Sequence, residues 1–302
     1  MASLYFEQAQ LMINVLTSIP LDGFALKGGT AINFFYENMP RYSVDIDLTF
    51  TKVSSRAEAI AEIHQAMHQI KHTLDKLNYN SLLINADDNN PAIKLNIFTE
   101  NASVIIEPNT TLRGTLLPIE NRSLVDQVVN TFKVSAAVPC LAYQEVYAGK
   151  LNAMLDRQHP RDIFDMHKYW QKNQSIKDLL DCFIAYVAQS NRPFSELLDS
   201  NELDITKVYE TDFAGMTVEK ISIDALINTR KTLFSEIKKS MTDSHKDFLL
   251  SMMRGTPDWS LMPFSDLKDM PAIQWKLHNI EKMPAVKNTA EIKKLKKIFD
   301  YR

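Results

Sequence analysis

Glycine and cysteine are scarce in this chain, which has 7 glycines and 2 cysteines among 302 residues. Neither the dinucleotide-binding pattern GxGxxG nor the P-loop pattern GxxxxGK[ST] can be written anywhere, which excludes Rossmann and P-loop nucleotide sites. Cys140 and Cys182 lie too far apart for a CxxC motif, so a cysteine-rich zinc site or a redox pair is not expected. So few cysteines fit a reducing cytoplasm, and we expect a cytoplasmic protein.

Long apolar runs and an excess of charge of one sign are also missing. No window approaches 18 uninterrupted apolar residues, and the N-terminus has no basic segment followed by an apolar one. We therefore expect a protein that is neither secreted nor membrane-spanning. The 34 Lys and Arg nearly balance the 37 Asp and Glu, for a net charge of -3. This balance argues against nucleic-acid binding through a broad positive field and leaves local basic patches open.

The spacing of apolar residues predicts an α+β N-terminal domain, residues 1–168, and a mainly helical C-terminal domain, residues 169–302. A chain of this length can bury a sizeable core without disulfides or a structural metal. The predicted elements are a helix that ends before Pro20, a strand at 24–26, a short helix at 31–36, a strand at 43–50, a helix at 55–77, strands at 92–98 and 103–107, and helices at 143–157, from about 161, at 221–237 and at 243–253.

A glycine pair followed by two aspartates on a strand is the strongest site signal. Gly28-Gly29-Thr30 precedes the short helix, and Asp45 and Asp47 alternate with apolar residues on the strand at 43–50. Carboxylates at i and i+2 share one face of a strand and offer the oxygen ligands that Mg²⁺ prefers. A glycine pair before a helix exposes backbone N–H groups to phosphate, and a Thr hydroxyl can add to them. The pattern predicts a nucleoside triphosphate and Mg²⁺ site; the alternative is a half-exposed strand preceded by an ordinary turn.

A third acidic residue, Glu107, ends the apolar strand at 103–107. Two-metal nucleotidyl transfer usually needs a carboxylate that supports the metal near the attacking oxygen and helps to deprotonate it. Glu107 is a candidate for this role if its strand lies beside the strand of Asp45 and Asp47. Asn96, on the preceding strand, is a weaker candidate because a neutral amide is a poor metal ligand. The alternative for Glu107 is an edge-strand glutamate without a catalytic role.

A further polar group spans the helix at 143–157 and the start of the next helix. Lys150 lies in mid-helix and can reach a phosphate as a point charge. Asp162 and Asp165 are three residues apart on the first turn of the following helix, so we expect them to share a face. The alternative is a surface helix with exposed salt bridges.

Two other patterns favour structural roles. His64, His68 and His72 form an i, i+4, i+8 row that could bind a metal. No acidic residue is interleaved on the same face, so we interpret the row as an exposed helix flank. The lysine-rich end, residues 287–302, is interpreted as a solvated face, with RNA contact as the minority alternative.

The stretches KGGT, residues 27–30, and RYSVDIDL, residues 41–48, resemble motif I of the AbiEii/AbiGii nucleotidyltransferase toxins. This family includes the MenT enzymes and belongs to the DNA polymerase β-like superfamily. The resemblance covers nearly the whole chain and is weakest over residues 170–240. It continues at Glu107 and at residues 112–115, 147–151, 155–165, 248–251, 254–255, 257–259, 271–272 and 275–277.

The resemblance implies a polymerase β-like nucleotidyltransferase domain with a mixed sheet, a helical C-terminal domain, and an NTP in a cleft between the two. Pro108 departs from the family pattern, which more often has β-branched or polar residues there, and predicts that the strand of Glu107 ends early. Carried over residue by residue, the resemblance implies a triphosphate and metal motif formed by Gly28, Gly29, Thr30, Asp45, Asp47 and Glu107, a phosphate-contacting Lys150, an essential Asp165 with Asp162 beside it, and phosphate-orienting Arg157 and Arg161.

The implied function is that of a type IV toxin-antitoxin or abortive-infection toxin. With two Mg²⁺ ions, it would transfer NMP from an NTP to an acceptor, with the 3′ end of tRNA as the expected acceptor, and so stop translation and growth. A cognate antitoxin is implied, although type IV antitoxins need not contact the toxin. Two alternatives stay open: transfer to a protein or small-molecule hydroxyl, and a catalytically silent nucleotide-binding module that acts through a partner.

Overall fold

The computed structural model describes residues 2–85 and 93–301, and it divides into two compact units. Unit 1 comprises Met1–Val146 and Phe213–Lys220, and unit 2 comprises Tyr147–Asp212 and Ile221–Arg302. The division falls after Val146, earlier than the predicted boundary after residue 168, so that most of helix α5 (Tyr143–Arg157) and all of α6 (Pro160–Asn173) belong to unit 2. Between these two helices, the ring centroids of Tyr147 and Tyr169 are 4.8 Å apart.

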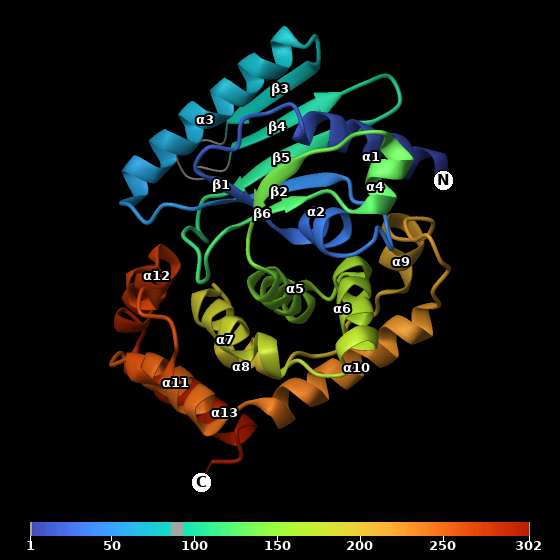
Figure 1. Ribbon diagram of the computed structural model, residues 1–302. Helices are drawn as coiled ribbons and strands as arrows, with labels where there is room; N and C mark the ends of the chain where they lie inside the picture. The colour runs from blue at the N-terminus through green and yellow to red at the C-terminus, as the bar shows by residue number, and fades with distance from the viewer. Residues whose placement is uncertain (1, 86–92, 302) are drawn as a thin grey trace. The chain divides into compact units, whose positions relative to one another are not determined.

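In the described part of unit 1, the strands form one mixed seven-stranded sheet in the order β3-β4-β5-β2-β1-β7-β6 (Figure 1). Strand β2 is parallel to β5, β1 is parallel to β7, and the other neighbours are antiparallel. The predicted α+β class and mixed sheet are thereby confirmed. The strands are β1 (Phe24–Leu26), β2 (Asp45–Phe50), β3 (Asn80–Asn85), β4 (Ile93–Phe98), β5 (Ser103–Asn109), β6 (Glu120–Ser123) and β7 (Ala137–Cys140).

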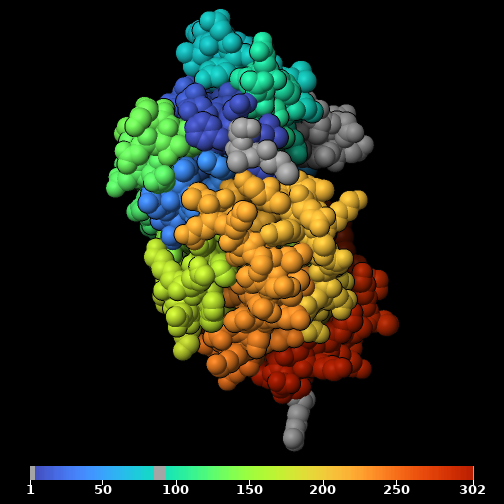
Figure 2. Space-filling model, turned by 90° about the vertical axis from the view of Figure 1, so that its right-hand side faces the viewer, coloured from blue at the N-terminus to red at the C-terminus, as the bar shows by residue number. Residues whose placement is uncertain are grey.

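Two long helices pack on the sheet of unit 1. Helix α3 (Arg56–Lys76) contacts β3 and β4, and α1 (Ala2–Leu16) contacts β5 and β2. The α3 side chains buried at spacings of three and four include Ile63, Met67, Ile70 and Leu74, which form the predicted apolar face. A shorter helix, α4 (Asp126–Phe132), lies at the surface of unit 1 as the bright green bulge in Figure 2.

Two predictions for unit 1 need correction, and four of its elements were not predicted. The short helix begins earlier than predicted, because Gly28 and Gly29 are already part of α2 (Gly28–Ala31), which continues as the π-helical turn η1 (Ile32–Tyr36). Strand β5 continues through Pro108, which pairs with Leu48 of β2. The described pairing of β5 with β4 ends at Ile106, so the missing N–H of Pro108 leaves no gap in that ladder.

The sequence analysis did not predict four elements of unit 1: β3, β6, β7 and α4. Strand β3 carries three consecutive apolar residues and so lacks a period of two, and β7 contains Pro139, which weakens a strand pattern. Residue 92, the predicted first residue of one strand, lies outside the described residues, as does Arg302 at the lysine-rich end.

The described residues of unit 2 contain no strand, which confirms the predicted helical part. None of the described helices is long and apolar enough to cross a membrane. Besides α5 and α6, this unit contains η2 (Lys177–Leu179), α7 (Leu180–Gln189), α8 (Phe194–Leu198), α9 (Thr206–Asp212), α10 (Ile223–Ser240), α11 (Asp243–Met253), η3 (Trp259–Leu261), η4 (Leu267–Asp269), α12 (Pro271–Glu281) and α13 (Ala285–Ile298).

The segment Phe213–Lys220 leaves the helical part of the sequence and packs in unit 1. It forms a short antiparallel ladder with residues 40–42: Arg41 bridges Thr217, the Tyr42 N–H donates to the carbonyl of Met216 at 2.9 Å, and the Val218 N–H donates to the carbonyl of Pro40 at 3.0 Å. The loop that precedes β2 is therefore held by residues that come much later in the chain.

The two patterns interpreted as structural can now be placed. On α3, His68 and His72 are exposed and His64 is half-buried. Two of the three rings are therefore solvent-exposed, which fits the interpretation of the row as a helix flank. On α13, Lys293 and Lys297 are exposed, as expected for a solvated face.

Candidate active site

The Gly-Gly segment at the start of α2 lies directly against the carboxylate of Asp47. Gly28 has φ +70°, and a Cβ added there would lie 2.6 Å from Asp47 Oδ2. The backbone N–H of Lys27 donates to the carbonyl of Asp47 at 3.0 Å. Gly28 is therefore required twice, for its left-handed backbone and for the close approach of the carboxylate.

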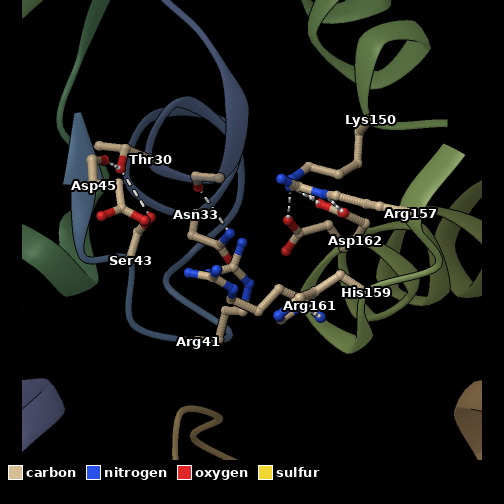
Figure 3. A network of polar contacts seen from close by, with 12 residues as sticks. Thr30, Asn33, Arg41, Ser43, Asp45, Lys150, Arg157, His159, Arg161 and Asp162 are labelled. Atoms are coloured by element: carbon tan, nitrogen blue, oxygen red, sulfur yellow. Dashed lines mark hydrogen bonds and ion pairs between the residues drawn. The ribbon is translucent and has the colours of Figure 1, made fainter. Parts of the chain in front are cut away.

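Thr30 joins the same segment to the beginning of β2. Its hydroxyl donates to the carbonyl of Asp45 and lies 2.8 Å from the hydroxyl of Ser43 (Figure 3). Thr30 is buried, so its hydroxyl anchors the Gly-Gly segment to the strand of the two aspartates. A direct contact of Thr30 with phosphate stays a prediction.

The acidic residues of β2 and β5 form a row on one face of the sheet. On β2, Asp45 and Asp47 are half-buried on one face, and Ile46 and Leu48 are buried on the other. In the parallel ladder, Asp47 is directly paired with Glu107 of β5. The sequence-based condition for a third carboxylate, a strand beside that of the two aspartates, is therefore met.

The carboxylate of Glu107 has a partner that the sequence did not reveal. Its Oε2 lies 3.0 Å from Nζ of Lys94 on β4, and both side chains are about 40% exposed, at 44% and 40%. Lys94 lies on the same face of β4 as Asn96. The alternation of polar and apolar residues along β4 was therefore the sequence signal that could have placed Lys94 on this face. Asn96 pairs with Ile105 of β5, one strand further from the aspartates than Glu107.

The oxygen donors of β2 fit Mg²⁺, which is commonly bound by one or two carboxylates and completes its shell with substrate phosphate and water. Asp45 and Asp47 supply two carboxylates on a rigid central strand. Among the described residues, no three His, Cys, Asp or Glu side chains are grouped so that they could hold a metal ion together. Oxygens of the substrate would therefore have to complete the coordination of Mg²⁺. Whether Glu107 is a ligand stays a prediction, because its carboxylate faces Lys94.

A second polar cluster lies within unit 2, and its lysine and two aspartates are buried. Nζ of Lys150 is 2.8 Å from Oδ1 of Asp162 (Figure 3). It is also 3.1 Å from Oδ2 of Asp165. Arg157 adds two hydrogen bonds to Asp162, from Nε to Oδ2 and from Nη2 to Oδ1. Asp162 and Asp165 share a face as predicted, but the alternative of an exposed salt-bridged helix is wrong because both are fully buried.

The electrostatics of this cluster keep Asp162 ionised. Burial by itself would raise the pKa of Asp162, but the charge of Lys150 and the hydrogen bonds and charge of Arg157 outweigh it and hold the pKa well below its usual range. Asp162 is therefore a buried anion that orients two cations. The side chain of Arg157 is 57% exposed, so it can also reach a ligand from its other side.

The turn between α5 and α6 positions the next part of this cluster. His159 is the N-cap of α6, and its Nδ1 accepts a hydrogen bond from the Arg161 N–H at 3.1 Å. Burial, and then the charge of Arg161, lowers the pKa of His159 to about 4. At neutral pH the ring is therefore a neutral acceptor.

Gln158, which had no predicted role, fixes this turn with φ +49°. Its Oε1 accepts from Nη1 of Arg230 at 2.9 Å and from the Leu203 N–H at 3.0 Å, and its Nε2 donates to the carbonyl of Asn201 at 2.7 Å. A buried amide with three partners holds its backbone in one arrangement. The start of α6 is thus tied to α10 through Gln158.

The structure brings the predicted residues together in two sets, one within each unit. Arg41, Ser43, Lys94 and Gln158 were not predicted as site residues; two of them lie in the motif-like stretch 41–48, but nothing in their spacing indicated their contacts. The unit 1 set is Gly28, Gly29, Thr30, Asp45, Asp47 and Glu107, and the unit 2 set is Lys150, Arg157, Arg161, Asp162 and Asp165.

Comparisons with known proteins address the identity of the chain. No curated protein matches it. Among solved structures, MenT4, a nucleotidyltransferase toxin from Mycobacterium tuberculosis H37Rv, is similar with a TM-score of 0.59 and 14% sequence identity over 92% of each chain, which shows a shared fold. The profile of the family described as nucleotidyl transferase AbiEii toxin, type IV TA system, matches residues 12–279. Since this match spans most of the sequence, the chain belongs to the AbiEii family of nucleotidyltransferase toxins of type IV toxin-antitoxin systems.

Proposed function

We propose that this nucleotidyltransferase uses Mg²⁺ to transfer NMP from an NTP to a hydroxyl at the acidic face of β2. The observation that carries the proposal is the row formed by Asp45, Asp47 and Glu107, with the backbone of Gly28 against the carboxylate of Asp47. When bound, two Mg²⁺ ions would neutralise the charge that develops on the transferred phosphorus. Membership of a nucleotidyltransferase family supports an NTP as the substrate and a divalent metal as the cofactor.

The residues of unit 1 would divide the work by position. Asp45 and Asp47 hold the metal, and the Gly28-Gly29 backbone receives the triphosphate, whose pyrophosphate leaves as the new phosphodiester forms. Glu107, beside Asp47, takes the proton of the attacking hydroxyl. In unit 2, we assign phosphate contacts to Lys150, Arg157 and Arg161. Asp162 and Asp165 help to position Lys150, and Asp162 also helps to position Arg157.

The proposed acceptor is the 3′ end of tRNA, whose modification would block aminoacylation, translation and growth. The resemblance to the MenT enzymes supports this acceptor, and the toxin family supports an antitoxin that restrains the enzyme. The net charge of -3 is compatible with recognition of one RNA end through a few local cations.

The test is incubation of the purified protein with each labelled NTP, total RNA and Mg²⁺, followed by separation on a denaturing gel. We expect label in a band of tRNA size, and we expect its loss in Asp47→Asn, which keeps the shape of the side chain and removes its charge. Asp22→Asn is the matched control, because Asp22 is an exposed acid of the same unit.

Three outcomes would count against parts of the proposal. Label in the Asp47→Asn reaction, or none with any NTP, contradicts transfer at β2. Label in protein or in a small molecule retains the chemistry and replaces the acceptor. Full activity of Glu107→Gln across the pH range removes Glu107 from the proton transfer.

A further inference from the structure

The guanidinium of Arg41 lies against the second glycine of the Gly-Gly segment. A Cβ added to Gly29 would lie 2.5 Å from Nη2 and 3.4 Å from Cζ of Arg41, and 3.2 Å from Oγ of Ser43. Gly29, unlike Gly28, does not have a positive φ. Backbone conformation therefore does not explain the glycine, whereas room for the guanidinium does.

Arg41 is held in this place from several directions. Its side chain is buried, and its Nη1 donates to the carbonyl of Tyr42 at 2.8 Å. Its backbone is part of the ladder with residues 216–218. Figure 3 shows Arg41 beside Asn33, whose Nδ2 donates to the carbonyl of Gly29 at 2.9 Å. A side chain fixed in this way loses little further conformational entropy when a ligand binds.

The two glycines therefore separate opposite charges, with the Asp47 carboxylate against Gly28 and the Arg41 guanidinium against Gly29. A triphosphate bound with Mg²⁺ needs both: carboxylate oxygens for the metal, and donors for the phosphate oxygens that the metal does not neutralise. The planar guanidinium presents five N–H donors and matches phosphate oxygens in pairs, which a lysine cannot do.

We propose that Arg41 is a phosphate-binding residue of the NTP site, and that position 29 is glycine because any side chain would displace its guanidinium. The inference rests on the proposed function in one respect, namely that the triphosphate binds at the Gly28-Gly29 segment.

The experiment measures equilibrium binding without an acceptor, so it does not depend on transfer. The probes are a non-hydrolysable NTP, the corresponding NMP and inorganic tripolyphosphate, each with Mg²⁺. We expect Arg41→Gln to weaken NTP and tripolyphosphate binding by about tenfold to a hundredfold, the usual worth of hydrogen bonds to a charged group. The NMP affinity should change much less. Arg41→Lys should recover part of the affinity, and Gly29→Ala should reproduce the loss with Arg41 still present.

Arg113→Gln is the matched control, because Arg113 is another buried arginine of unit 1. It donates to the carbonyls of Ser54 and Ser55, which follow the end of β2, at 3.3 Å. We expect its loss to lower the melting temperature and to leave the ratio of NTP to NMP affinity unchanged. The ratio of NTP to NMP affinity, measured on folded Arg41→Gln, distinguishes the two roles of Arg41. A phosphate contact predicts a lower ratio, whereas a purely structural role predicts an unchanged one.

The inference is overturned if Arg41→Gln binds tripolyphosphate as the wild type does, or if it loses NTP and NMP affinity equally. Failure of the proposed function would give a different result. If the wild-type protein binds tripolyphosphate through Arg41 but transfers no NMP, the phosphate contact is supported and the proposed reaction is rejected. If the wild-type protein transfers NMP and Gly29→Ala binds NTP normally, the proposed reaction is supported and the stated reason for the glycine is rejected.

Discussion

Replacement of Gly28 by alanine should damage the acidic site far more than it damages the fold. An L-residue at φ +70° costs roughly 1–2 kcal/mol of stability. The new Cβ would also lie 2.6 Å from Oδ2 of Asp47, whereas ordinary contact begins at 3.4 Å, so the carboxylate must move by 3.4 − 2.6 = 0.8 Å. A misplacement of about 1 Å in a catalytic group can lower the rate by roughly a hundredfold.

Gly23 offers a matched control for this change. It lies in the same unit with φ +78°, and its added Cβ would meet only Cε2 of Phe50, at an ordinary 3.6 Å. Gly23→Ala should therefore carry the backbone cost without moving Asp47. We expect similar losses in the free energy of unfolding for the two variants, by urea denaturation, but a loss of about a hundredfold in kcat/KM for Gly28→Ala alone.

The Mg²⁺ dependence identifies the cause of the loss. If the carboxylate of Asp47 is displaced, Gly28→Ala should need more Mg²⁺ for half-maximal activity, while Gly23→Ala should need the same as the wild type. Equal activity losses in the two variants, or an unchanged Mg²⁺ requirement in Gly28→Ala, would refute the argument that the glycine makes room for the carboxylate.

Two further predictions concern the buried cluster of unit 2. Asp162→Asn should lower the free energy of unfolding by about 3–5 kcal/mol, because it leaves Lys150 buried beside fewer negative charges; a loss below about 1 kcal/mol in urea denaturation would contradict a buried ion pair. His159 has a pKa of about 4 in the folded protein, below its usual value, so the unfolded chain binds more protons between about pH 6.5 and 4 and stability should fall as the pH falls through this window. His159→Asn keeps an N-cap without this titration and should lose less stability there; melting curves with the same pH dependence in both proteins would exclude His159 as the source.

The elements that were predictable are those whose burial is one-sided. On β2 and α3, one face is apolar and the other polar, so the periodicity reports the structure directly. Strand β3 has apolar residues on both faces, with Leu82 55% and Ile84 42% exposed, and β6 has no apolar side chain at all. Their place in the sheet follows from pairing with neighbours, which a local pattern does not contain.

The candidate site shows the same limit. The sequence alone predicted that three acidic residues, Asp45, Asp47 and Glu107, lie on strands. The parallel register of β2 and β5 then pairs Asp47 with Glu107. The partners of these groups come from elsewhere in the chain: Lys94 from β4, and Arg41 from a loop. Such contacts depend on tertiary packing, so spacing along the sequence gives no signal for them.

The ladder between residues 40–42 and Phe213–Lys220 has a consequence for synthesis on the ribosome. The described strands of unit 1 have all been synthesised once Cys140 is added, yet the partner of Arg41, Thr217, follows 217 − 41 = 176 residues after it. A nascent chain that ends before residue 213 cannot form these bonds. The loop of Arg41 is therefore completed only after most of the toxin has been translated, and an unfinished chain lacks this support.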